Sequence, residues 1–270
     1  MATITGSGVL VGTAGNDTIT GDTTNDVLAG HSGSDILNGG DGDDILAPDT
    51  SVYLISDGFP FNAERYWAST DDGAVDHVDG GGGFDRVAMR FDGVTANIAA
   101  DFSDPSVVQT IAGSTIVNVE QLEIVLGSGS DTVVLGLGDD VVFGEAGNDT
   151  LDGGDGDDTL DGGNGTDVLS GGSGIDWLQG GEGDDTLDGG DQDDRLFGQA
   201  GDDRLIGGGG TDQLEGDGTN PFESDAGNDT AVLAGNLADY TYAVSELGDG
   251  RLRLTNSVTR EVDHIRFVEQ

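Results

Sequence analysis

The chain has 270 residues, of which 50 are Gly and 53 are Asp or Glu. It has only 9 Lys plus Arg, no Cys, and a formal net charge of −44. This charge argues against nucleic acid or anionic membrane partners, and the lack of Cys excludes disulfides and thiolate metal sites. No apolar run approaches the roughly 20 residues of a membrane span.

The N-terminal part of the chain combines a cap with a short array of nine-residue blocks. Met1–Val11 lacks the basic and apolar regions of a Sec-type signal peptide, and we expect it to form a degenerate coil that caps the array. Gly12–Ala47 then repeats with Asp at the sixth position and an aliphatic residue at the eighth. The sixth positions are Asp17, Asp26, Asp35 and Asp44.

The period is lost from Pro48 to Asp79, where we expect a long excursion from the array. Its rings either pack on the flank of the array or form a recognition loop: Tyr53, Phe59, Phe61, Tyr66 and Trp67. An acidic stretch follows, for which we expect a solvated turn, with a further metal site as the alternative: Asp71, Asp72, Asp76, His77 and Asp79.

Gly80–Ala88 reads GGGGFDRVA and is interpreted as one isolated repeat. Its Asp85 is not a multiple of nine residues from Asp44 or from Asp131. Strand-like stretches follow, which we interpret as wider β-helical coils that join two arrays: Arg86–Phe91, Ala96–Phe102, Ser106–Ile111 and Thr115–Leu126.

Residues 126–215 form ten consecutive blocks, of which Gly153–Asp161, GGDGDDTLD, is typical. The fourth residue is Gly in nine of the ten, with Gln192 as the exception, and the eighth is always aliphatic. The sixth residue is Asp in every block: Asp131, Asp140, Asp149, Asp158, Asp167, Asp176, Asp185, Asp194, Asp203 and Asp212.

One block predicts one half of a coil. The glycines permit a tight turn over the first six residues, and the last three predict a short strand with its middle side chain inward. Two blocks therefore make one coil of 18 residues, and successive coils stack as parallel strands. Stacking places Asp149 beside Asp167, where two carboxylates about 5 Å apart repel by roughly 3 kcal/mol. A divalent ion between them removes this repulsion, and an all-oxygen site suits Ca²⁺.

These blocks resemble the RTX (repeats-in-toxin, hemolysin-type) nonapeptide GGxGxDxUx. The resemblance implies an all-β, right-handed parallel β-roll or β-helix, folding triggered by extracellular calcium, and type I secretion. It also implies that the sixth-position Asp residues named above are the metal ligands, for up to about ten calcium ions. Blocks with a substituted glycine, such as those with Gln192 and Gln199, are expected to bind more weakly.

Residues 216–270 are predicted to form a C-terminal β cap, with alternating strands at Tyr240–Val244, Arg251–Leu254 and Val262–Phe267. Asp229 resumes the motif out of register. We also expect the chain to be shortened at this end relative to a longer parent protein. The predicted parts are thus 1–47 (cap and short array), 48–125 (insertion and wide coils), 126–215 (main array) and 216–270 (cap).

Catalytic motifs are missing: the sequence contains neither HExxH nor G-x-S-x-G. We therefore expect no catalytic residues and no organic cofactor, and predict a secreted calcium-binding structural or interaction module. The alternative is a non-catalytic RTX appendage of a larger secreted enzyme or adhesin. The expected location is extracellular or cell-surface, with cell-surface or matrix components as partners. An outward face with Trp177 and Arg195 one coil apart, close enough for a cation–π contact, either binds a partner or is covered by the excursion or the cap.

Overall fold

The computed structural model describes residues 2–48, 54–55, 65–66, 76–217, 230–232, 240–244, 251–256 and 262–266. The elements within these ranges are all β-strands, and none of the described residues belongs to a helix that could cross a membrane. The chain divides into two compact units, Met1–Gly127 and Ser128–Gln270. The predicted division into four parts stays a prediction.

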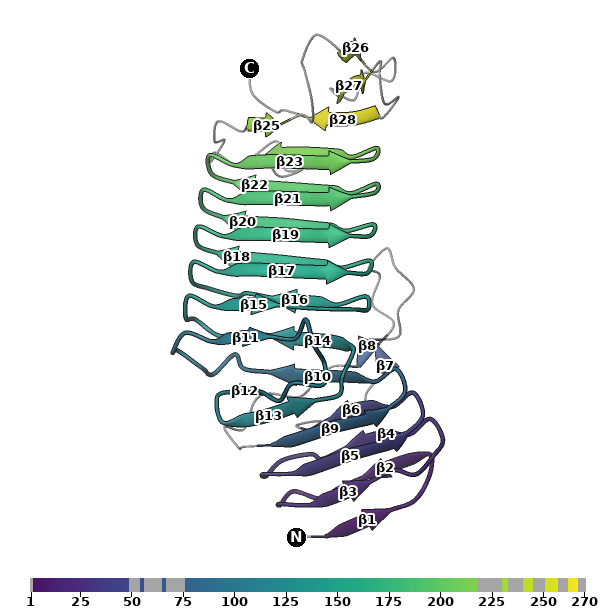
Figure 1. Cartoon of the computed structure of the whole chain (residues 1–270). Helices are drawn as coiled ribbons and strands as arrows, with labels where there is room; N and C mark the ends of the chain where they lie inside the picture. Colours follow the sequence, from purple (N-terminus) through teal and green to yellow (C-terminus); the bar gives the residue numbers. More distant parts are fainter. Residues whose placement is uncertain are drawn as a thin grey trace. The chain divides into compact units, whose positions relative to one another are not determined.

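In the first unit, strands stack in parallel as two walls of a solenoid (Figure 1). One wall has antiparallel β12 (Gln109–Ile111) at its edge and consists otherwise of β1 (Thr3–Thr5), β3 (Thr18–Thr20), β5 (Ile36–Asp41), β9 (His77–Gly82) and β13 (Ser114–Val117). The other wall consists of β2 (Val9–Val11), β4 (Val27–Ala29), β6 (Ile45–Ala47), β10 (Arg86–Arg90) and β14 (Gln121–Val125). This unit also contains β11 (Ala99–Asp101) and an antiparallel pair, β7 (Leu54–Ile55) and β8 (Arg65–Tyr66).

The second unit repeats the same arrangement with greater regularity. One wall consists of β15 (Thr132–Val134), β17 (Thr150–Asp155), β19 (Val168–Ser173), β21 (Thr186–Asp191), β23 (Arg204–Gly209) and β25 (Thr230–Val232). The other begins with β16 (Val141–Phe143), β18 (Thr159–Asn164), β20 (Trp177–Glu182), β22 (Arg195–Ala200) and β24 (Gln213–Asp217). The predicted all-β parallel roll is confirmed.

The core is a pair of aliphatic rows supplied by the eighth position of each block. Leu160, Leu178 and Leu196 pair in register on successive strands and are 0% exposed. Because one block forms one half-coil, the residue at the eighth position of a block lies beside the eighth-position residue 18 residues further along the chain. The degenerate N-terminal coil obeys the same register, since Leu10 pairs with Leu28.

From β17 onward, the strands of the main array are longer than predicted. β17 covers Thr150–Asp155, so it includes the first three residues of the following block. Gly154 pairs with Gly172 on β19 although both have positive φ angles, of 95° and 106°. The prediction of a three-residue strand holds for β3, β4, β6, β15 and β16. It was wrong for the main-array strands from β17 onward, because glycine lets the chain kink and still continue its parallel pairing.

The long excursion returns to the array earlier than predicted. Asp76 is 1% exposed, and β9 pairs with β5 so that Val78 lies beside Leu37. Asp85 in turn accepts a 2.8 Å hydrogen bond from the Asp44 backbone N–H. The interpretations of Asp76 as part of a solvated turn and of Gly80–Ala88 as an isolated repeat were therefore wrong. The extra residues before Asp76 change the spacing along the chain but leave the stacking intact.

Four non-glycine residues of the repeat blocks take backbone conformations that normally favour glycine. His31, Glu145 and Gln199 occupy the second position of their blocks, with φ angles of 75°, 69° and 74°. Gln192 occupies a fourth position, with φ of 84°. The roll thus holds these four residues in a left-handed conformation, at a cost of roughly 1–2 kcal/mol each.

Near the C-terminus, β26 (Tyr240–Val244), β27 (Arg251–Asn256) and β28 (Val262–Arg266) pair antiparallel, and β28 lies parallel to β24. Strands therefore occur where the sequence predicts them, whereas the capping role of residues 216–270 stays a prediction. In the wide coils, the predicted strand Thr115–Leu126 is divided into β13 and β14 at Asn118, whose φ is 52°. The predictions for some residues concern parts of the chain outside the described ranges: Tyr53, Phe59, Phe61, Trp67, Asp71, Asp72 and Asp229.

Candidate metal centre

The sixth-position Asp side chains are buried and stack in rows one coil apart, which we call Asp ladders. All fourteen predicted ligands are between 0% and 2% exposed. The backbone N–H of Asp140 donates to Oδ1 of Asp158 at 2.7 Å, and that of Asp149 donates to Oδ1 of Asp167 at 2.7 Å. The predicted neighbours thus do stack, and one carboxylate oxygen of each accepts a hydrogen bond from the preceding coil.

The second carboxylate oxygen, Oδ2, is buried without a hydrogen bond in many of these residues: Asp44, Asp85, Asp149, Asp158, Asp167, Asp176, Asp185 and Asp194. A buried carboxylate oxygen with no donor is costly unless a cation or a proton compensates it. These atoms are therefore the strongest sign of a ligand in the described part of the chain.

The first Gly of each block opens a small space beside this oxygen. A Cβ placed on Gly153 would lie 2.3 Å from Oδ2 of Asp158 and 2.6 Å from the carbonyl oxygen of Gly171 in the next coil. Gly171 stands in the same relation to Asp176, at 2.2 Å. A carboxylate oxygen and a backbone carbonyl oxygen therefore open onto one space that a side chain would fill.

This donor set fits a hard divalent cation. No cluster of three or more His, Cys, Asp or Glu side chains suited to a metal occurs among the described residues, so any ion held here depends on carbonyl oxygens as well. Oxygen-only sites of mixed carboxylates and carbonyls are typical of Ca²⁺, whereas Zn²⁺ takes nitrogen or sulfur ligands. The residues present therefore fit calcium.

Burial makes the charged form of these carboxyl groups unfavourable. It raises the pKa of Asp149, Asp158 and Asp185 from 3.8 to about 7, and that of Asp194 to about 8. Repulsion by neighbouring carboxylates, such as that of Asp176 on Asp158, adds to the increase. A bound cation reverses this balance because it favours the ionised carboxylate.

Asp17 and Asp26 differ from the other predicted ligands. Oδ2 of Asp17 accepts hydrogen bonds from the backbone N–H of Thr13 at 2.6 Å and from its hydroxyl at 2.7 Å. Oδ2 of Asp26 accepts one from the Asp22 N–H at 2.8 Å. The hydrogen bond from the Ala2 N–H, followed by that from the Thr13 hydroxyl, lowers the pKa of Asp17. Thr13 and Asp22, at the second position of their blocks, thus provide donors that compete with a cation. Glu145 occupies the same position but provides none, since Oδ2 of Asp149 accepts no hydrogen bond.

Sequence reasoning missed two members of the ladders, Asp76 and Asp85. Asp35 donates its backbone N–H to Oδ1 of Asp76 at 2.7 Å, as Asp44 does to Asp85. The missed signal was local: Asp76 and Val78 precede Asp85 and Val87 by nine residues. Neither Asp76 nor Asp85 is a multiple of nine residues from Asp44, so the period of the short array does not reveal this pair.

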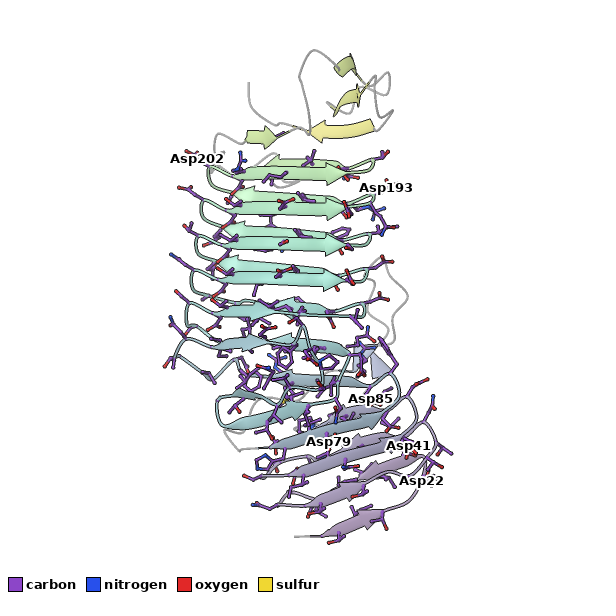
Figure 2. The ribbon with its side chains drawn as sticks, viewed as in Figure 1. Asp22, Asp41, Asp79, Asp85, Asp193 and Asp202 are labelled. Atoms are coloured by element: carbon purple, nitrogen blue, oxygen red, sulfur yellow. The ribbon has the colours of Figure 1, made fainter. Side chains whose placement is uncertain are left out.

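A second set of side chains, at the fifth position, lies at the outer turns and was also missed. Oδ1 of Asp193 accepts the Thr211 N–H at 2.7 Å, and Oδ1 of Asp157 accepts the Ile175 N–H at 2.8 Å. Asp193 and Asp202 lie at opposite edges of the second unit, because successive blocks alternate between its two edges (Figure 2). These side chains bond exposed turns of adjacent coils to each other.

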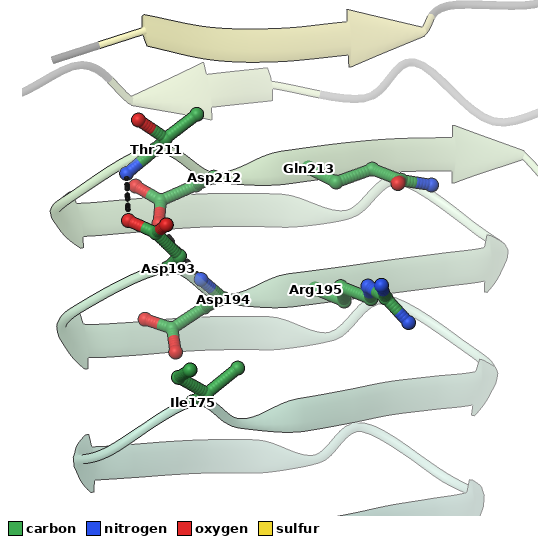
Figure 3. A pocket seen from close by; sticks show the side chains of 7 residues that line it. All are labelled: Ile175, Asp193, Asp194, Arg195, Thr211, Asp212 and Gln213. Carbon is green, nitrogen blue, oxygen red and sulfur yellow. Dashed lines mark hydrogen bonds between the residues drawn. The ribbon is translucent and has the colours of Figure 1, made fainter. Parts of the chain in front are cut away.

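One pocket lies beside the end of an Asp ladder (Figure 3). Its volume is about 350 Å³, and it is lined by Ile175, Asp193, Asp194, Arg195, Thr211, Asp212 and Gln213. Asp194, whose buried Oδ2 accepts no hydrogen bond, thus lies in the wall of a pocket at the turn edge of the roll.

The predicted contact on the outward face is present. The Arg195 guanidinium carbon lies 5.8 Å from the centre of the Trp177 ring, and the Phe197 ring lies 4.7 Å from it, centroid to centroid. Trp177 and Phe197 are both half-buried. The three side chains therefore form one packed cluster across β20 and β22.

A comparison with models of protein families agrees with this geometry. The family model for the RTX calcium-binding nonapeptide repeat matches four times, at residues 11–46, 125–160, 161–196 and 188–223. A structure of the extracellular lipase LipA from Serratia marcescens matches at 18% identity and a TM-score of 0.20, over 97% of this chain and 38% of that one. At that TM-score the likeness carries no argument, and the chain spans well under half of the lipase. A search of curated proteins found no match. Since the repeat model matches half of its length, the chain belongs to the RTX calcium-binding nonapeptide repeat family.

Proposed function

We propose that this chain is a secreted calcium-binding structural or interaction module that folds when it binds extracellular calcium. The observation that carries the proposal is the buried Oδ2 of Asp158 and its equivalents, which accept no hydrogen bond and face the carbonyl oxygen of the next coil. Many such carboxylates in a chain with a net charge of −44 make the roll dependent on a compensating cation.

The chain prepares each site through its own hydrogen bonds. Oδ1 of Asp158 is held by the Asp140 N–H, which orients the carboxylate so that Oδ2 is turned toward the space beside Gly153. Oδ2 of Asp158 and the carbonyl of Gly171 would hold the ion. Bound calcium supplies positive charge that offsets the buried carboxylates. Because these oxygens come from two coils, a filled site joins one coil to the next.

The calcium dependence supports an extracellular role. Oxygen-rich sites of extracellular modules bind calcium in the range of roughly 10⁻⁴–10⁻³ M, so they are empty at cytosolic calcium levels and filled outside the cell. The chain would therefore leave the cell extended and self-repelling, through a type I route. Outside, the folded roll would present its rigid faces to cell-surface or matrix components.

The direct test is far-UV circular dichroism of EDTA-treated protein during calcium titration, with magnesium as the control. The proposal predicts a cooperative transition from coil to β-structure that calcium induces and magnesium does not. Full β-structure in EDTA that calcium leaves unchanged would refute both the ligand assignment and the folding switch.

A matched pair of variants assigns the effect to the ladder. Asp158→Asn keeps an oxygen for the Asp140 N–H but removes the charge, and should raise the calcium concentration at the folding midpoint several-fold. Asp157→Asn removes the same charge one residue away, keeps the acceptor for the Ile175 N–H, and should leave the midpoint within a factor of about two. Equal effects of the two variants would show that general charge, rather than ligation, controls folding.

A further inference from the structure

The Asp ladders of the first unit end in a coil that has no nonapeptide repeat, and they end differently. The ladder through Asp76 ends on a hydroxyl, because the Asp76 N–H donates to Oγ of Ser114 at 3.0 Å. The ladder through Asp85 ends on a carboxylate, because the Asp85 N–H donates to Oε2 of Glu120 at 2.9 Å. Glu120 therefore takes the place that the next Asp takes elsewhere in the ladder.

The other ligand positions of an array site are also reproduced at this end. A Cβ on Gly80 would lie 2.7 Å from Oδ2 of Asp85 and 1.9 Å from the carbonyl oxygen of Asn118. One coil earlier, Gly39 has the same relation to Oδ2 of Asp44, at 2.2 Å, and to the carbonyl of Gly80, at 2.3 Å. The Asn118 carbonyl thus replaces that of a repeat glycine.

Asn118 is held in the conformation that this role requires. Its φ of 52° is left-handed, its backbone N–H donates to the Pro105 carbonyl at 2.6 Å, and its side-chain amide donates to Oδ1 of Asp79 at 2.8 Å. Asp85 itself is 0% exposed, and its Oδ2 accepts no hydrogen bond. The buried Oδ2 of Asp85 and the carbonyl oxygen of Asn118 thus lie beside the same space at Gly80. The carboxylate of Glu120 accepts the hydrogen bond from the Asp85 N–H.

From this arrangement we propose an additional calcium site formed by Asp85, Asn118 and Glu120, outside the residues that match the repeat family. Two carboxylates and a carbonyl supply the hard oxygen donors that calcium takes. The site joins the last repeat of the short array to the coil of β13 and β14, where no repeat glycines or Asp residues continue the ladder. The choice of calcium rests on the proposed function, whereas the position of the site rests on these three residues.

The test counts ions on the full chain by native mass spectrometry in saturating calcium, with hydrogen exchange to locate the effect. Glu120→Gln keeps an acceptor for the Asp85 N–H but removes the charge, and should bind one ion fewer than the unmodified chain. Calcium-dependent protection of peptides covering 114–125 should fall with it. Asp43→Asn is the matched control: it lies beside the same ladder and keeps an acceptor for the Phe84 N–H, so its ion count should be unchanged.

Asp85→Asn, alone and combined with Glu120→Gln, completes the test. If both residues bind one ion, each single variant and the double variant lose that same ion, and circular dichroism shows that the rest of the roll still folds. An unchanged ion count and unchanged protection in Glu120→Gln would overturn this site and leave the proposed function intact. Failure of the unmodified chain to bind any calcium would instead refute the proposed function as well.

Discussion

The backbone N–H of Asp140 donates a 2.7 Å hydrogen bond to Oδ1 of Asp158, one coil further along the chain. The same bond joins Asp158 to Asp176 and Asp176 to Asp194. Asp158, Asp176 and Asp194 therefore each have a structural oxygen that joins two coils and a second oxygen that is left for a ligand. This division explains why a residue with such a high desolvation cost is repeated through the interior of the roll.

Without calcium, the roll should be more stable in acid than at neutral pH. The pKa of Asp158 is raised from 3.8 to about 7 and that of Asp194 to about 8. A raised carboxyl pKa favours folding fully below the unfolded value, 3.8, and this contribution is lost as the pH rises through the folded value. In EDTA, far-UV circular dichroism should therefore show β-structure near pH 5 that is lost between about pH 6 and 8.

Saturating calcium serves as the control for this pH dependence, since the ion favours the ionised carboxylates and should abolish the transition. At subsaturating calcium, the midpoint concentration should rise as the pH is lowered from 8 to 6, because protons compete for the same oxygens. A β-signal in EDTA that is constant from pH 5 to 8 would show that the buried carboxyl groups do not control folding.

Truncation of the aliphatic row should destabilise the roll. Leu178 is 0% exposed and lies between Leu160 and Leu196, so Leu178→Ala should lower the free energy of unfolding by about 2–5 kcal/mol. Urea unfolding in saturating calcium measures this. Val168→Ala, at a side chain that is 46% exposed, should change it by less than about 1 kcal/mol. Comparable losses from both substitutions would mean that the row is not the core.

Restoration of a repeat glycine should stabilise the protein. Gln192 has φ of 84°, so Gln192→Gly should raise the free energy of unfolding by roughly 1 kcal/mol. Gln213→Gly is the opposite control, because this residue lies in β24 and is not among those with positive φ; it should lower stability. The result would contradict the strain argument if Gln192→Gly were as destabilising as Gln213→Gly.

The aromatic cluster on β20 and β22 should contribute to stability. Trp177→Ala removes the contacts with Phe197 and Arg195 and should lower the free energy of unfolding by about 1–2 kcal/mol. Thr159→Ala, on the neighbouring strand, is the control and should have a smaller effect. If Trp177→Ala left stability unchanged, the cluster would be better explained as a partner-binding surface.

The sequence predicts the regular part of this fold well. A strict nine-residue period determines which residues meet, so the pairing of Leu160 with Leu178 and of Asp149 with Asp167 follows from counting alone. The cation–π contact between Trp177 and Arg195 follows in the same way. The chemistry of the repeat then limits the choice of metal ion. Repeated carboxylates beside glycine carbonyls provide oxygen donors, which favour a hard cation such as Ca²⁺.

Two features escaped prediction because they depend on contacts that no period encodes. The length of an excursion does not reveal where the chain returns, so the place of Asp76 in a ladder was missed. Glu120 lies in a coil with no repeat, and only the stacked structure shows that its carboxylate meets the N–H of Asp85. The fifth-position bonds, such as that of Asp193 with Thr211, were missed because those side chains vary in type.

Asp17 and Asp35 stack one coil apart at a sequence separation of 18 residues, whereas Asp35 and Asp76 form the same contact at a separation of 41. The roll thus accommodates additional residues at the boundary between two coils, and the next coil stacks in the same register. This boundary is a natural attachment point for an engineered peptide or domain. Insertions at several such boundaries would place peptides or domains at regular intervals along the roll, in a scaffold that folds when calcium is added.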